Sequence, residues 1–399
     1  MKRFISVPAL GLLSLFATIR IYAQDILPKD INPDSRNRLP LIKREDLDDR
    51  GKKAYDAAIA SFAGAPQAMG AEIRLHSTPG IIAQTESPLG MALMQLAILT
   101  TGREHDQPYE WSLHEMQAIA VGLDPAVIDI VRHRKPLVKL GDSEAVIIQL
   151  GREIFNKHKL SSENYARALR VLGGKSNLVD VVGLMGDYSR TSATLAAFNQ
   201  QLPPGWKQLL PLPFTPPDDI HPDSRSRLPL IEGPSPAPAP GSFSNSLYGR
   251  ELAPKGTGPT HIRRHGAGLQ SLETGVGRKV IDVAILVSAR EHDAQYDWTI
   301  NELAAVRDGL DPAIIDVVRN RKPVAGLTEK DACLIEFGRE LFGKHYVSSG
   351  TYTRAVKLFG ERDLVDLVDV MAQHSREAAL LAAFDQHLPA GQKPLLPIP

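Results

Sequence analysis

The sequence predicts an all-α protein made of two homologous helical domains. Apolar residues recur with the period of an α-helix, so that Leu93, Leu96 and Ala97 share one face. No stretch shows convincingly the alternation expected of a half-buried strand. The chain also repeats itself after about 180–190 residues, a period far too long for a solenoid repeat, so each unit is a domain.

The repeat is clearest where Arg103–Pro136 aligns without a gap to Arg290–Pro323, because 20 of 34 positions are identical. The opening Asp30–Leu41 likewise returns as Asp219–Leu230. A Pro-rich seam separates the two units, since Pro cannot continue a helix. The predicted organisation is residues 1–23 as a signal peptide, 24–202 as domain 1, 203–218 as a linker and 219–399 as domain 2, with a Pro/Ala-rich insert at 232–242.

The N-terminal segment has the features of a secretory signal. Lys2 and Arg3 precede the apolar run 4–19, and a small residue, Ala23, stands at the expected cleavage position. The alternative is an N-terminal anchor helix, although the run is short for a membrane span and Arg20 interrupts it. Cleavage after Ala23 leaves a formal charge of −3, and we expect a secreted or periplasmic protein that leaves the membrane.

Helix starts are predicted at corresponding places in the two units. Asp124 and Asp311 each precede a Pro, the pattern of an N-cap followed by Pro at the first helical position. Ser161 and Ser348 begin two further predicted helices. We expect about six helices in each domain.

Composition excludes several classes of protein. The 46 basic and 46 acidic residues give no basic excess, which argues against a nucleic-acid partner. The one cysteine, Cys333, cannot form an internal disulfide, so stability must come from burial of apolar surface.

The densest group of chemically useful residues lies between Gln95 and His114. Gln107, Glu110 and His114 are spaced to share one face of a helix. A carboxylate one turn before an imidazole fixes its tautomer and raises its pKa, which gives a proton donor. The alternative is a solvated Glu–His pair on an exposed face.

This region resembles the carboxymuconolactone decarboxylase family, which includes the alkylhydroperoxidase D-like proteins. The resemblance rests on Leu96–Leu99, on Tyr-Glu-Trp-x-x-His at 109–114, and on Leu-x-Gly-x-Tyr at 184–188. It implies alkylhydroperoxidase D-like helical bundles packed as a pseudo-dimer, with three two-domain chains forming a homo-oligomer. Peroxidase members carry a Cys-x-x-Cys pair, whereas this chain has Gln107 and Glu110 there, so thiol peroxidase activity is not expected.

The resemblance implies cofactor-independent decarboxylation, or related proton-transfer chemistry, on a small carboxylated lactone or enolisable acid in domain 1. His114 would be the general acid and Glu110 would orient it. We expect no cofactor and no metal. Arg103 could hold a substrate carboxylate, or form an ion pair within the protein. The predicted substrate-binding residues are Arg103, His76, Gln95, Gln107, Trp111 and Tyr188. The alternative function is a non-catalytic oligomeric scaffold or ligand-binding protein.

The second unit departs from this pattern, because Asn301 stands where the first unit has His114. Without that imidazole we expect domain 2 to be structural or to bind a ligand without turnover. Tyr188 becomes His374, and either could reach a pocket. Glu104-His105-Asp106 and its repeat Glu291-His292-Asp293 occur in both units, which favours a polar network at the contact between domains over a metal site.

Overall fold

The computed structural model confirms the all-α prediction. It describes residues 27–41, 43–46, 49, 52, 56, 87–213, 219–229 and 265–398, and within them the regular elements are helices, with two isolated bridges and no strand. The first half, residues 87–213, contains α4 (Met91–Glu104), α5 (Pro108–Ala120), α6 (Pro125–Arg132), α7 (Asp142–Lys157), α8 (Ser162–Val171) and α9 (Lys175–Ala197), and a short 3₁₀ helix, η1 (Arg44–Asp46), precedes it.

In the second half, residues 265–398, the four helices that follow α12 repeat the lengths of α4 to α7 in order. Its helices are α12 (Leu269–Val276), α13 (Arg278–Glu291), α14 (Gln295–Arg307), α15 (Pro312–Arg319), α16 (Glu329–Lys344) and α17 (Ser349–Phe384). Both α4 and α13 have 14 residues, and both α7 and α16 have 16. The helix α17 is broken at Gly360, whose φ of 76° is left-handed, at the position where Gly173 separates α8 from α9.

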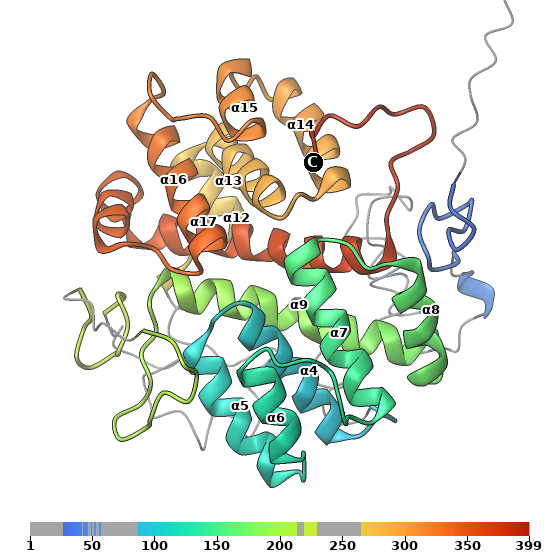
Figure 1. The fold of residues 1–399 in the computed structure, drawn as a ribbon. Helices are drawn as coiled ribbons and strands as arrows, with labels where there is room; N and C mark the ends of the chain where they lie inside the picture. Colours follow the sequence, from blue (N-terminus) through green and yellow to red (C-terminus); the bar gives the residue numbers. More distant parts are fainter. Residues whose placement is uncertain are drawn as a thin grey trace, which may run out of the picture.

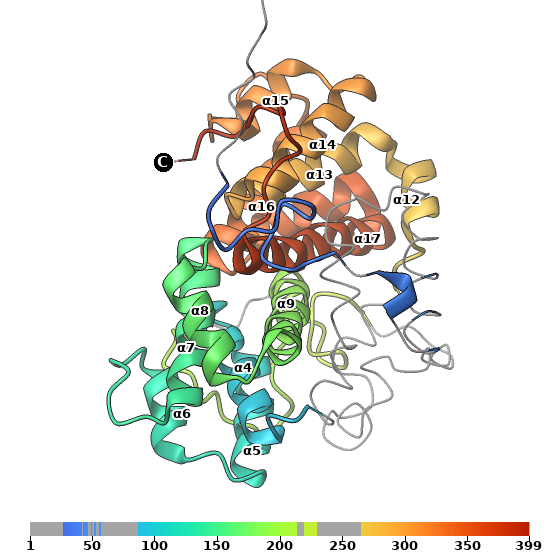
Figure 2. The ribbon, with the colours of Figure 1, turned by 90° about the vertical axis from the view of Figure 1, so that its right-hand side faces the viewer.

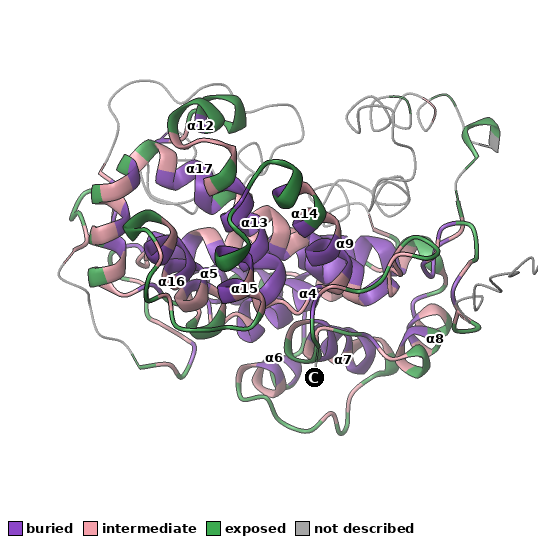
Figure 3. Ribbon diagram, turned by 90° about the horizontal axis from the view of Figure 1, so that it is seen from above, coloured by how far each residue is buried: buried purple, intermediate pink, exposed green. Residues whose placement is uncertain are grey.

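The two halves meet along α9 and α17. Figure 1 shows these helices side by side across the middle, with the rest of the first half below and the rest of the second half above. Figure 2 shows the same division from the side. Each half has its own apolar core, centred on α4 or on α13, and Figure 3 shows these helices buried beneath partly exposed ones.

The two halves are joined by the repeated segments at the start of each unit, residues 30–41 and 219–229, which we call the opening segments. Arg38 is fully buried, and it donates hydrogen bonds to the carbonyl oxygens of Leu160 in the first half and Ala383 in the second. Arg227, at the corresponding place in the second opening segment, donates a hydrogen bond to the carbonyl oxygen of Ala197 at the end of α9. The opening segment of each unit therefore contacts the last long helix of the other half.

The predicted helix starts are confirmed. The side chains of Asp124 and Asp311 accept from the backbone N–H two residues on, with Pro next in each case, and Ser161 and Ser348 cap α8 and α17. The predicted signal peptide, residues 1–23, and the predicted insert at 232–242 lie outside the described residues. No helix among the described residues is both long enough and apolar enough to span a membrane.

Glycine allows the closest helix crossing in each half. A Cβ at Gly151 on α7 would lie 2.4 Å from Thr100 Cγ2 on α4, and one at Gly338 would lie 2.3 Å from Val287 Cγ1. We expect Gly151→Ala to lower the free energy of unfolding by about 1–3 kcal/mol in urea denaturation, because the helices must separate. Gly343→Ala, where a Cβ meets nothing within 4 Å, is the control and should be neutral or stabilise by up to about 1 kcal/mol. Equal stability of both variants would contradict the close crossing.

Candidate functional site

The structure brings four of the predicted site residues together in the first half. His114 Nδ1 lies 2.9 Å from Gln95 Oε1, and its Nε2 lies 3.3 Å from Glu110 Oε2. The ring of Tyr188, from α9, meets the His114 ring edge-on with centroids 4.9 Å apart. Helices α4, α5 and α9 each contribute to this group because the apolar stripes of all three face one core.

The His114 group is closed. The His114 side chain is 0% exposed and the Glu110 side chain 2%. The contact between Glu110 and His114 Nε2 has an angle unsuited to a hydrogen bond, so it is an electrostatic contact. In this structure the imidazole is therefore closed to solvent.

Gln107 stands at the start of the helix that carries Glu110 and His114, and it is itself buried. It is the N-cap of α5, where its Oε1 accepts from the Tyr109 N–H, and its Nε2 donates to the Ser192 carbonyl on α9 at 3.4 Å. Glu110 follows one helical turn later and His114 one turn after that. A row of polar side chains therefore runs inward from Gln107 between α5 and α9.

The other predicted site residues lie elsewhere. Arg103 donates to the Arg132 carbonyl at 2.7 Å and pairs with Asp106, which is the ion-pair alternative considered for it. Trp111 is fully buried in the core, and its indole N–H donates to Glu115. His76 lies outside the described residues.

The repeated Glu-His-Asp motifs meet at the contact between the halves. His105 stacks on His345 with ring centroids 5.7 Å apart, and His292 lies 6.1 Å from His158. Asp106 faces His345 at 3.9 Å, and in the same way Asp293 faces His158 at 3.6 Å. Residues of both halves thus form one polar network, which was the interpretation favoured from the sequence.

Burial sets the protonation of two of these histidines. It lowers the pKa of His105 to about 3 and that of His292 to about 3. Each Nδ1 donates to a backbone carbonyl one turn earlier, at 3.0 Å for His105 and 2.8 Å for His292, as a neutral imidazole can. Among the described residues no group of three or more His, Cys, Asp and Glu side chains is placed to hold a metal ion.

The second half holds a carboxylate–imidazole pair that the sequence comparison missed. Asp297, at the position of Glu110, accepts from His374 Nδ1 at 2.8 Å, and His374 stands on α17 at the position of Tyr188. The expectation that the second half lacks an imidazole at this place is therefore wrong. Asn301, at the position of His114, donates to Asp297 at 2.7 Å and holds the carboxylate in place.

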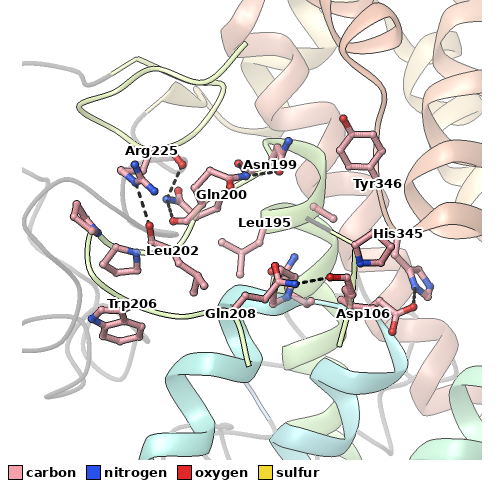
Figure 4. Close-up of a pocket in the computed structure, with 18 of the residues that line it drawn as sticks. Asp106, Leu195, Asn199, Gln200, Leu202, Trp206, Gln208, Arg225, His345 and Tyr346 are labelled. Atoms are coloured by element: carbon pink, nitrogen blue, oxygen red, sulfur yellow. Dashed lines mark hydrogen bonds and ion pairs between the residues drawn. The ribbon is translucent and has the colours of Figure 1, made fainter. Parts of the chain in front are cut away.

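A hollow lies between the halves rather than at His114. It has a volume of about 580 Å³ and is lined by the loop after α9, by the start of α5 and by residues 344–346 of the second half. Figure 4 shows Trp206, Arg225 and Tyr346 around it, with Asp106 and His345 at one side. Gln107 is also in its wall. The sequence signal for this site was the Pro-rich seam, because residues 201–213 form one wall.

The chain matches no protein-family model, no curated protein and no solved structure.

Proposed function

We propose that this protein binds a small organic acid in the hollow between two duplicated, carboxymuconolactone decarboxylase-like domains packed as a pseudo-dimer. The matching helix lengths, the shared 20 of 34 positions and the packing of α9 on α17 support the duplication. The observation that carries the binding proposal is a hollow of about 580 Å³ with aromatic and cationic walls, which is the size and chemistry of small-molecule sites.

The charges around the hollow favour an anion. Arg225 and Lys344 line it, while its carboxylate, Asp106, is already paired with Arg103 and Arg134. A guanidinium binds a carboxylate through two parallel hydrogen bonds, and among the described residues Arg225 donates only its Nε–H, to the Leu202 carbonyl. The faces of Trp206 and Tyr346 suit the apolar part of the ligand.

The test is a thermal-shift and calorimetric screen of small aromatic and aliphatic carboxylates against their neutral amides. We expect the acids to bind, and we expect Tyr346→Ala to weaken binding about tenfold or more because the aromatic wall is lost. Val138→Ala, which changes an exposed apolar side chain away from the hollow, is the control and should bind normally. Equal binding of acids and amides, or unchanged affinity in Tyr346→Ala, would contradict the proposal.

A second candidate is the predicted proton transfer at His114. The buried contact of Glu110 with His114, and the row of polar side chains that leads to it from Gln107, favour this candidate. It would act on the lactone or enolisable acid implied by the resemblance.

We further propose that the chain is exported and self-associates as a trimer. The signal-like N-terminal segment supports export. Exposed apolar pairs at corresponding positions of α5 and α14 support association, and these are Met116 with Ile119 and Leu303 with Val306.

A further inference from the structure

The Asp297–His374 pair has the geometry of an acid–base site. The carboxylate on α14 is fully buried, and it accepts from His374 Nδ1 at 2.8 Å. This fixes the neutral ring as the Nδ1–H tautomer and leaves the lone pair on Nε2. The amide of Asn301 holds the other carboxylate oxygen, so that the carboxylate cannot turn away.

The imidazole of this pair is reachable, in contrast with His114. The His374 side chain is 18% exposed, whereas the His114 side chain is 0% exposed. His374 Nε2 forms no hydrogen bond with the described residues, and it is not a fully buried atom. The nitrogen opposite the buried carboxylate is thus the one open to a reactant.

We propose that Asp297 and His374 form a general acid–base site in the second half, which moves a proton on a small carbonyl compound with an acidic C–H beside the carbonyl. An imidazole whose second nitrogen is held by a carboxylate can take a proton from a weak carbon acid of this class and return it. The proposal does not depend on the ligand of the hollow, because the hollow is lined by other residues.

The charged neighbours of His374 support this role. Burial lowers the pKa of His374, but the carboxylates of Asp297 on α14 and Glu377 on α17 outweigh that effect and raise the pKa above its ordinary value. Arg376 is turned toward Glu377 and toward Asp187 on α9. The ring therefore accepts a proton readily and stays paired with a carboxylate when it is charged.

The reaction step balances without a co-reactant. His374 Nε2 takes the proton from the carbon, and the electron pair of the C–H bond forms the C=C bond of the enolate. The negative charge moves to the carbonyl oxygen. The imidazolium then returns a proton, or in heavy water a deuteron, to the same carbon.

The experiment measures exchange of the C3 hydrogens of 2-oxobutanoate, and of neutral butanone, by proton NMR in heavy water. We expect wild-type protein to accelerate exchange above the protein-free rate, and His374→Gln to lower that acceleration at least tenfold. His133→Gln is the matched control, because His133 also faces a carboxylate, that of Asp129 at 3.4 Å, but is 42% exposed on the surface. No acceleration by the wild type, or full activity in His374→Gln, would overturn the proposal.

A second measurement tests whether Asp297 acts on the His374 ring or only fills space in the core. We expect Asp297→Asn to lower the pKa of His374, followed by NMR of the ring protons, and to lower the exchange rate with it. An unchanged pKa in a folded Asp297→Asn variant would overturn the role given to the carboxylate. Loss of exchange in His114→Gln, with His374→Gln active, would place the chemistry in the first half and would overturn the proposal.

Discussion

Arg38→Ala should lower the free energy of unfolding by about 3–5 kcal/mol, since it removes a fully buried side chain and leaves buried carbonyl oxygens and the partly exposed Asp30 carboxylate without their partner. The Arg38 side chain is 0% exposed and lies 2.8 Å from Asp30. It also donates to two carbonyl oxygens, one in each half, and lies 4.7 Å from the centre of the Tyr165 ring. Loss of the side chain thus leaves polar groups in both halves without partners.

The measurement is equilibrium unfolding in urea, followed by circular dichroism. Arg227→Ala should have an effect of similar size, because Arg227 is also fully buried, pairs with Asp219 at 2.8 Å and lies 4.9 Å from the Tyr352 ring. Arg170→Ala is the control, since this side chain caps a carbonyl on an exposed helix face and its loss should cost less than about 0.5 kcal/mol. A loss below about 1 kcal/mol for Arg38→Ala would show that the opening segment does not join the halves.

Local signals in the sequence predicted the helices well. Asp124 and Ser161 cap helices where the sequence placed them, because an N-cap depends only on a side-chain oxygen and the next backbone N–H groups. The buried arginines were not predicted as such. Their burial depends on contacts such as Arg38 with Ala383, which are 345 positions apart in the chain.

The candidate site was predicted in part. Spacing within one helix placed Glu110 beside His114, and the resemblance to the decarboxylase family led us to expect Gln95 among the binding residues. The comparison of the two units position by position then suggested that the second unit had lost its imidazole. In the structure the carboxylate keeps its position, but the imidazole comes from α17, 77 positions along the chain, and only tertiary packing brings His374 to Asp297.

The network between the halves makes stability sensitive to acid. His105 and His292 keep a pKa of about 3 in the folded protein, against an ordinary value of 6.5. Between these values the unfolded chain binds protons that the folded chain does not. The free energy of unfolding must therefore fall as the pH is lowered from 6.5 toward 3. The pKa values of Asp106 and Asp293 are also lowered from 3.8, so their contribution is lost in the same direction as the pH falls below 3.8.

The slope is large enough to measure. Each histidine contributes up to about 1.4 kcal/mol per pH unit once the unfolded imidazole is protonated, so the two together contribute up to about 2.7. Urea unfolding at several pH values between 7 and 4.5 should give this slope in the wild type. His374 acts in the opposite sense near the upper end of this range, because its pKa is raised above 6.5, and in the lower part it is protonated in both chains and leaves the slope unchanged.

Variants of His105 and His292 test whether the pH dependence of the free energy of unfolding comes from the contact between the halves. His105→Gln and His292→Gln remove the titrating groups, and each should reduce the pH dependence by about half, whatever its effect on stability at pH 7. His133→Gln changes an exposed imidazole and should leave the slope as in the wild type. If the double variant His105→Gln/His292→Gln keeps the full slope, other groups cause the acid sensitivity. The contact between the halves would then not be held by neutral histidines.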